Sequence, residues 1–140
     1  MNEIKSILFL CTGNSCRSQM AEGLAKKLYP NVEVYSAGIE THGINPYATK
    51  VMSEIGIDIS NHTSDLTTTY SDRSIDLVVT VCDNAKENCP YFLAKKMIHQ
   101  SFDDPPALAK SLQDEEEVLK IYRKVRDQIK DFIQNVIISP

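Results

Sequence analysis

The sequence predicts a single-domain α/β protein with a parallel sheet flanked by helices on both faces. A chain of 140 residues suits one domain with one hydrophobic core. Short apolar runs of strand length alternate along the chain with stretches in which apolar residues recur at helical spacing. No internal repeat or low-complexity segment interrupts this pattern. Because such alternation is typical of strands joined by crossover helices, we expect one parallel sheet and one domain over residues 1–140.

The first half of the chain contains two predicted strands and two predicted helices. The apolar run from Ile7 to Leu10 predicts a buried strand, and the segment from Gln19 to Leu28 predicts a helix. A second strand is predicted from Val32 to Ala37. Asn45-Pro46 is typical of a helix start, since Asn caps the first turn and Pro suits the first helical position. Gly56 is a suitable C-terminal stop for that helix.

The second half predicts two further strands and a long final helix. The polar segment from Leu66 to Ser74 is expected to form one or two helical turns. Leu77 to Val81 predicts the third strand, and Lys96 to Gln100 a weaker fourth. The final helix is expected from about Asp114 to Val136, and its acidic start matches the helix dipole. Its predicted buried face comprises Val118, Ile121, Tyr122, Val125, Ile129, Phe132, Ile133 and Val136.

The segment between the first strand and the first helix predicts an oxyanion site. It reads Cys11-Thr12-Gly13-Asn14-Ser15-Cys16-Arg17-Ser18. A strand, a tight glycine-containing loop and a helix start let backbone N–H groups converge on an anion, and the helix dipole adds positive potential. The expected cradle consists of the N–H groups of Thr12, Gly13, Asn14, Ser15, Cys16 and Arg17.

Two side chains at the ends of this loop suggest its chemistry. Cys11 and Arg17 are placed so that a thiol and a planar guanidinium can face one bound anion. The same field favours thiolate over thiol, which makes Cys11 a candidate nucleophile. Ser18 is expected to donate its hydroxyl to the Cys11 sulfur, to cap the helix, or to do both. Asn14 is expected to fix the loop by bonding neighbouring backbone.

The composition of the chain limits which partners and which cellular compartment we expect. The net charge of −4 gives no reason to expect nucleic acid or an anionic membrane surface as a partner. No apolar run is long enough to span a membrane, and the N-terminus lacks a signal-peptide pattern, so we expect a cytoplasmic protein. We also expect a monomer. Thiols normally stay reduced in the cytoplasm, so four cysteines need a role other than structural disulfides. Zinc binding is the alternative role for these cysteines, although the sequence lacks the paired C-x-x-C units typical of a zinc site.

The loop resembles the phosphate loop of the low-molecular-weight protein tyrosine phosphatase superfamily. Its continuation, Ser18-Gln19-Met20-Ala21-Glu22-Gly23, is similar to the thioredoxin-coupled arsenate reductases, where the phosphatases usually have Ser-Pro. The resemblance extends over residues 34–40, 56–65, 76–82, 89–90 and 102–105. It implies a four-stranded parallel sheet of order 2-1-3-4 and a site for arsenate or a phosphate-like oxyanion.

The resemblance also implies a three-cysteine relay. After Cys11 binds arsenate, Cys82 attacks the Cys11 sulfur and arsenite leaves; Cys89 then attacks Cys82, and thioredoxin reduces the resulting Cys82–Cys89 disulfide. Cys16 matches no step, and we expect it to pack the loop and to protect Cys11. Two alternatives stay open: a low-molecular-weight phosphatase that hydrolyses phosphate monoesters through a Cys11 phosphocysteine, and a non-catalytic redox-sensing or anion-binding module.

A carboxyl group is expected to supply a proton to the oxygen that leaves the bound anion. Asp104 is the candidate general acid, because by resemblance the acid is the residue before Pro105. Asp103 competes for this role, and turn formation is the alternative function of the pair. The following residues, Pro106-Ala107-Leu108, lack the aromatic side chains that line the mouth of the tyrosine phosphatases. This favours a small inorganic oxyanion.

A second group of polar residues is expected behind the loop. Glu22 follows the loop by about one helical turn, where an unpaired buried carboxylate would be costly. The resemblance implies a potassium ion there, with oxygen ligands from Asn14, Glu22, Ser36 and Asp65. A hydrogen-bond network without an ion, including Thr63, is the alternative. No cofactor is required for the relay itself, and no chemistry is assigned to His42, His62 or His99.

Overall fold

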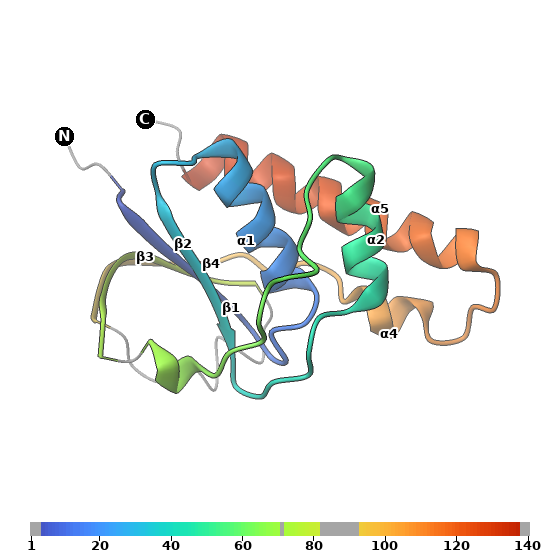
Figure 1. Cartoon of the computed structure of the whole chain (residues 1–140), viewed down its shortest axis with the longest axis horizontal. Helices are drawn as coiled ribbons and strands as arrows, with labels where there is room; N and C mark the ends of the chain where they lie inside the picture. Colours follow the sequence, from blue (N-terminus) through green and yellow to red (C-terminus); the bar gives the residue numbers. More distant parts are fainter. Residues whose placement is uncertain (1–3, 71, 82–92, 138–140) are drawn as a thin grey trace.

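The computed structural model describes residues 4–70, 72–81 and 93–137. Cys82 and Cys89, the predicted second and third thiols of the relay, lie outside the described residues. The four strands form one parallel sheet of order β2-β1-β3-β4 (Figure 1). The strands are β1 (Ser6–Cys11), β2 (Glu33–Gly38), β3 (Ser74–Thr80) and β4 (Leu93–His99). The predicted α/β class and strand order are therefore confirmed.

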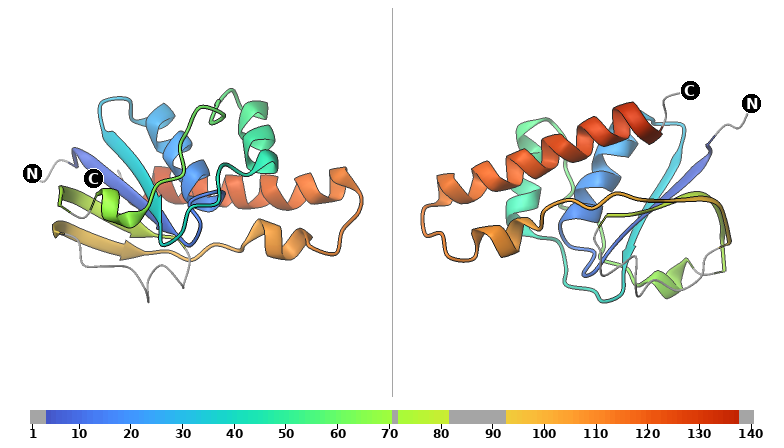
Figure 2. Two further views of the ribbon diagram at one scale, coloured as in Figure 1. Left: turned by 60° about the horizontal axis from the view of Figure 1, so that its bottom comes forward. Right: turned by 180° about the vertical axis from the view of Figure 1, so that it is seen from behind.

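The helices connect these strands and follow the last of them. The first three helical elements are α1 (Arg17–Leu28), α2 (Pro46–Glu54) and the 3-10 turn η1 (Thr67–Thr69). The others are α4 (Pro105–Ala109), α5 (Glu115–Phe132) and the π-helical turn η2 (Ile133–Ile137). The long helix α5 lies against α1, α2 and α4 (Figure 2). None of the described helices combines the length and apolarity needed to cross a membrane.

The central strand β1 carries the core and ends at the predicted site. All six of its residues are buried, so both of its faces are covered. Phe9 lies between Ser36 of β2 and Val79 of β3 in the sheet register. Cys11 is the last residue of β1 and lies opposite Gly38. In parallel sheets ligands bind beyond the carboxyl ends of the strands, and Cys11 is at that edge.

The two faces of the sheet are covered by different helical elements. Ser36 points toward α1, because its hydroxyl donates a hydrogen bond to Glu22 of that helix. Tyr35 points to the opposite face, since successive side chains of a strand alternate. Its ring lies 5.1 Å from the ring of Tyr70, which directly follows η1. Helical segments therefore lie on both faces, and η1 is the one that contacts β2 on the Tyr35 face.

Several element boundaries differ from the prediction. Helix α1 begins at Arg17, β3 at Ser74 and β4 at Leu93, each earlier than predicted. The short helix α4 was not predicted, although Pro105 and Pro106 occupy its first turn, where a missing N–H is tolerated. The final helix has about the predicted extent, but α5 stops at Phe132 and the chain continues as the π-helical turn η2.

The buried face of α5 is also broader than its apolar pattern predicted. Leu119 and Arg126 are buried, whereas Ile121 is only half-buried. Arg126 is accommodated because its guanidinium donates to the Val51 carbonyl at 2.8 Å and to Glu54 at 3.1 Å. Helix α5 packs against α1, α2 and α4, so part of its polar stripe faces protein. The Val136 side chain, predicted as buried, lies outside the described side chains.

The predicted start of α2 at Asn45-Pro46 is confirmed. The Asn45 Oδ1 atom accepts hydrogen bonds from the N–H groups of Tyr47 (2.9 Å) and Ala48 (3.2 Å). Its Nδ2 atom donates to the Tyr122 hydroxyl of α5 at 3.2 Å. The same residue therefore caps α2 and links it to α5.

We expect Asn45→Ala to lower the free energy of unfolding by about 1 kcal/mol relative to Asn45→Asp, because the aspartate retains the capping oxygen. Both variants lack the amide N–H that donates to Tyr122. Measuring them in a Tyr122→Phe background also removes any bond from the Tyr122 hydroxyl to the aspartate, so the difference between them isolates the cap. Urea unfolding followed by circular dichroism measures it. Equal stability of the two variants would contradict the capping role.

Candidate active site

The loop between β1 and α1 holds the predicted nucleophile next to a hydroxyl. The Cys11 sulfur lies 3.0 Å from Ser18 Oγ, and both side chains are buried. Asn14 Nδ2 donates to the same Ser18 oxygen at 2.8 Å. Since that oxygen accepts from Asn14, its own proton is available to the sulfur, where it stabilises a thiolate. The first of the two predicted functions of Ser18 is therefore supported by the geometry.

The other predicted function of Ser18, as helix cap, is wrong. The residue at the N-cap position of α1 is Cys16, so Ser18 lies inside the first helical turn. The cap has no side-chain hydrogen bond. The Ser18 hydroxyl instead points back to Cys11 and Asn14.

Asn14 is fixed by bonds to distant parts of the chain. Its φ of 49° lies in the left-handed region, which Asn tolerates better than most residues. Its Oδ1 atom accepts the N–H of Asp65 at 2.7 Å, and its carbonyl accepts Gln19 Nε2 at 3.0 Å. Asn14 thus stabilises the loop as predicted, but through a segment 51 residues away rather than through neighbouring backbone.

Gly38, at the end of β2, lets the loop pass close to the sheet. A Cβ atom at this position would lie 2.7 Å from the carbonyl oxygens of Thr12 and Glu40. It would also lie 2.8 Å from the backbone nitrogen of Asn14. These are backbone atoms that cannot move aside, so a side chain at Gly38 would displace the loop.

Arg17 and Asp104 meet at the mouth of the loop. Arg17 Nη1 donates to the Phe102 carbonyl at 2.9 Å, which fixes the guanidinium. Arg17 Nη2 lies 3.7 Å from Asp104 Oδ1. The Arg17 side chain is 12% exposed and that of Asp104 is 46% exposed, so the carboxyl can reach both the guanidinium and solvent. Asp103 is exposed. This geometry favours Asp104 over Asp103 as the general acid.

The second loop cysteine differs from the first. Cys16 is buried, and burial raises the pKa of its thiol well above the usual range, with a smaller contribution from the nearby Cys11. Cys16 therefore remains a thiol at neutral pH. This agrees with a packing role in the loop.

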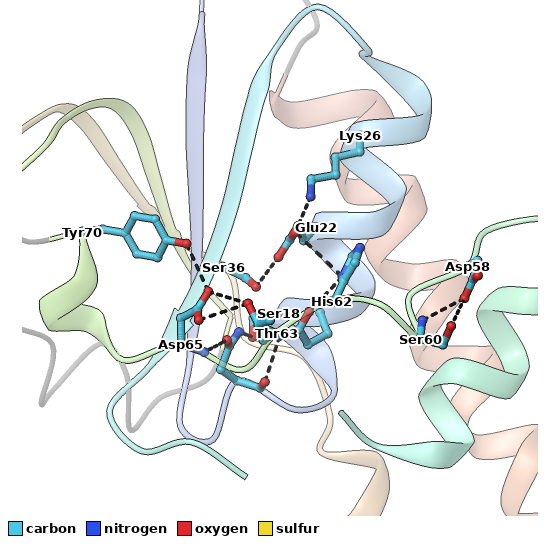
Figure 3. A network of polar contacts seen from close by, with 12 residues as sticks. Ser18, Glu22, Lys26, Ser36, Asp58, Ser60, His62, Thr63, Asp65 and Tyr70 are labelled. Carbon is cyan, nitrogen blue, oxygen red and sulfur yellow. Dashed lines mark hydrogen bonds and ion pairs between the residues drawn. The ribbon is translucent and has the colours of Figure 1, made fainter. Parts of the chain in front are cut away.

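Three of the four predicted potassium ligands, Glu22, Ser36 and Asp65, lie behind the loop (Figure 3). Glu22 is buried, accepts the Ser36 hydroxyl and lies 2.6 Å from the Lys26 ammonium. The Asp65 carboxylate accepts the hydroxyls of Thr63 (3.1 Å) and Tyr70 (3.2 Å). Asn14, bonded to the Asp65 N–H, is the fourth residue of the set.

A pocket of about 280 Å³ lies beside this group, and its lining includes Glu22, Lys26, His62, Asp65 and Tyr70. Burial, together with the Asp65 carboxylate, raises the pKa of Tyr70 to about 12. Burial lowers the pKa of His62, although nearby Glu22 acts in the opposite direction. Both groups are therefore largely neutral at neutral pH.

The donor set fits a potassium ion in its chemistry. Two carboxylates, an amide oxygen and a hydroxyl are hard oxygen ligands of the type that such cations prefer. The Lys26 ammonium and the hydrogen bonds already balance part of the charge, so the same residues also form a complete network without an ion. Across the described ranges, no cluster of three or more His, Cys, Asp or Glu side chains is arranged to hold a metal.

Sequence reasoning missed several residues of the site. The imidazole of His62 bonds the side chain of Gln19 at 3.0 Å, and the ring of His42 packs against Gly13. Ser64 donates its hydroxyl to the Gly13 carbonyl at 3.1 Å. No motif marks these residues, because they reach the loop from segments distant in sequence. The signal available was the polar character of Gln19 and Glu22 on a helix that must be largely buried.

A buried cysteine and an arginine share one loop at the carboxyl edge of a parallel sheet, an arrangement suited to a cysteine-based oxyanion site. The chain belongs to the low molecular weight phosphotyrosine protein phosphatase family, whose model matches residues 6–137. This confirms the resemblance inferred from the loop.

Comparison with individual relatives is more specific. The chain is 51% identical over 133 residues to an arsenate reductase of Staphylococcus aureus (strain Newman), covering 94% of this chain and 95% of the relative. It is 54% identical over 127 residues to that of Halalkalibacterium halodurans, covering 89% of each chain. A solved arsenate reductase in the phosphate binding state has a TM-score of 0.79 and 35% identity, covering 97% of this chain and 100% of that one.

The wider fold family also includes phosphatases. A tyrosine phosphatase of Erwinia amylovora superimposes with a TM-score of 0.74 at 20% identity, covering 96% of this chain and 92% of that one. At this identity the likeness concerns the fold alone.

We predict that Cys11 is alkylated by iodoacetamide faster than Cys16, Cys82 or Cys89 in mildly acidic buffer, because the loop and Ser18 stabilise its thiolate. Phosphate or arsenate should protect it. Ser18→Ala should slow the reaction, since the sulfur loses its donor. Mass spectrometry of the modified peptides measures each rate. A Cys11 rate no higher than the others would contradict the thiolate argument.

We also predict that potassium stabilises the protein relative to a bulky organic cation at matched ionic strength, because a ligand that binds only the native state raises its melting temperature. Glu22→Ala should abolish the difference, since it removes a buried carboxylate of the set. Differential scanning fluorimetry measures both. Equal melting temperatures of the wild type in the two salts would instead support the ion-free network.

Proposed function

We propose that the protein reduces arsenate to arsenite with Cys11 as the nucleophile. The observation that carries the proposal is the 51–54% identity to arsenate reductases over 89–94% of the chain. The site geometry is consistent with it, because the loop holds a thiol, a hydroxyl donor and a guanidinium where one oxyanion can bind. The phosphate-bound state of a structural relative supports the same class of ligand.

In the first step the oxyanion binds to the loop N–H groups and to Arg17. The Cys11 thiolate attacks arsenic, a sulfur–arsenic bond forms, and one oxygen leaves as water. Asp104, beside Arg17, supplies the proton that this oxygen requires. Ser18 stabilises the thiolate before the attack.

In the second step Cys82 attacks the Cys11 sulfur. A Cys11–Cys82 disulfide forms, the electron pair of the sulfur–arsenic bond passes to arsenic, and arsenite leaves. Cys89 then attacks Cys82, which frees Cys11, and thioredoxin reduces the Cys82–Cys89 disulfide. One backbone contact is consistent with an attack between these two segments of the chain: the N–H of Val81, the residue before Cys82, donates to the carbonyl of Leu10, the residue before Cys11, at 2.8 Å.

The cellular setting follows from the proposed chemistry. A relay that ends in thioredoxin requires a reducing compartment, so we assign the enzyme to the cytoplasm. We take it to act as a monomer without a required cofactor, with potassium as a bound ion behind the loop. Neither nucleic acid nor a membrane takes part.

The alternative function is hydrolysis of phosphate monoesters through a Cys11 phosphocysteine. Membership of the phosphatase family favours it, and it requires only Cys11, Arg17 and an acid. The residues after Pro105 are non-aromatic, which makes the mouth less suited to an aryl ester. We therefore treat hydrolysis as a side activity. A non-catalytic redox-sensing or anion-binding module, the third possibility, would show neither reaction.

Arsenate-dependent oxidation of reduced thioredoxin tests the proposal. Cys11→Ser should abolish this oxidation and any phosphate-ester hydrolysis, because both reactions need the nucleophile. Cys82→Ser should stop arsenate turnover but preserve slow hydrolysis, which needs no second thiol. Cys16→Ser is the matched control and should retain turnover. A Cys82→Ser enzyme that still turns over arsenate with thioredoxin would overturn the relay.

A further inference from the structure

Gln19 is fully buried, and its side-chain amide is held at both ends. The Nε2 atom donates to the Asn14 carbonyl at 3.0 Å and to the Thr63 carbonyl at 2.9 Å. The Oε1 atom lies 3.0 Å from His62 Nδ1. Both amide protons therefore go to backbone carbonyls, one of them inside the oxyanion loop. A buried amide used in this way holds two chain segments together.

The Asn14 carbonyl accepts its hydrogen bond from a side chain, whereas the neighbouring loop carbonyls accept theirs from backbone N–H groups. Those of Thr12, Gly13, Ser15 and Cys16 each accept a backbone N–H, from Glu40, His42, Asn45 and Met20. The Asn14 carbonyl accepts the Gln19 side chain. A substitution at Gln19 can therefore release this carbonyl without breaking a backbone hydrogen bond.

Holding this carbonyl orients a donor for the anion. Because the peptide between Asn14 and Ser15 is planar and trans, the Ser15 N–H points opposite to the Asn14 carbonyl and hence away from Gln19. The same contact supports the left-handed conformation of Asn14. The Asn14 side chain in turn donates to Ser18, which lies against the Cys11 sulfur.

Gln19 also fastens the loop to the segment from His62 to Asp65. That segment contacts the loop through the Asp65 N–H on Asn14 and the Ser64 hydroxyl on Gly13. Gln19 adds a third contact to the same segment, its bond to the Thr63 carbonyl. Asn14 is therefore fixed at two points: Gln19 bonds its carbonyl, and the Asp65 N–H bonds its side chain.

We propose that Gln19 is a positioning residue of the oxyanion site, which sets the Asn14–Ser15 peptide and, through Asn14 and Ser18, the reactivity of Cys11. The inference rests on the proposed role of Cys11 as the nucleophile. It assigns no contact between Gln19 and the substrate.

The test uses Gln19→Leu, which removes both donors at similar volume. Cys11 alkylation in mildly acidic buffer should slow about tenfold, because a displaced Ser18 hydroxyl stabilises the thiolate less well. Half-protection should need about tenfold more phosphate, because a displaced Ser15 N–H binds the anion less well. The matched control is Ile75→Ala, a buried residue at the amino end of β3, on the opposite edge of the sheet. It should destabilise the protein but leave both measurements unchanged.

A second variant keeps the test valid if Gln19→Leu does not fold. Gln19→Glu has the same shape, and its ionised carboxylate cannot donate to either carbonyl. Its alkylation rate relative to the wild type should rise as the pH falls, because the protonated carboxyl regains one donor. Circular dichroism at each pH verifies that the variant is folded, so the rescue reports on the loop and not on recovery from unfolding.

The possible failures are distinguishable. If wild-type Cys11 is neither fast nor protected by phosphate, the proposed function fails. If the wild type behaves as expected but a folded Gln19→Leu has the same alkylation rate and phosphate protection, the inference about Gln19 is wrong. Equal losses in Gln19→Leu and Ile75→Ala, or a Gln19→Glu ratio that does not change with pH, would also overturn it.

Discussion

The geometry around Cys11 depends on one constraint: the backbone carbonyls of the loop that follows it must bond to donors outside the loop. An anion cradle needs N–H groups that face inward, so the carbonyls of the same peptides must find donors outside the loop. Five consecutive loop carbonyls accept such a hydrogen bond, four from a backbone N–H and one from the Gln19 side chain. The distances from donor nitrogen to carbonyl oxygen are 2.9–3.0 Å. The accepting residues are Thr12, Gly13, Asn14, Ser15 and Cys16. Without these donors the loop would lose the geometry that concentrates positive potential on Cys11.

The donors come from three parts of the fold, which explains why the sheet edge matters. The chain leaving β2 supplies the N–H groups of Glu40, His42 and Asn45, and Gly38 allows it to approach the loop. Asn45 also begins α2 and bonds Tyr122 of α5, so the helical layer is tied to the loop. The first turn of α1 and the segment from His62 to Asp65 supply the remaining contacts. The loop from Cys11 to Arg17 is therefore held by several segments along the carboxyl edge of the sheet.

The polar group behind the loop follows from the same arrangement. Asn14 joins the loop to Asp65, and Ser36 of the neighbouring strand bonds Glu22 on the helix that follows the loop. A buried carboxylate is costly unless it is paired, and Lys26 at 2.6 Å supplies the opposite charge. The network therefore balances a charge that the fold places close to the loop that holds Cys11. A potassium ion would use the same oxygen atoms.

The sequence by itself determined the alternation of strands and helices, the loop from Cys11 to Arg17, and the cap at Asn45, because each depends on neighbouring residues or on a regular period. The strand order 2-1-3-4 came from the family resemblance carried by that loop, and the structure agrees with it. Tertiary structure alone decided that Arg126 is buried, that α5 ends in a π-helical turn, and that Ser18 serves Cys11 rather than the helix end. It also decided the roles of Gln19 and Asp65, whose partners are far away in the chain. The physical reason is that a hydrogen bond between distant segments depends on how the elements pack, and a local sequence pattern carries no record of that packing.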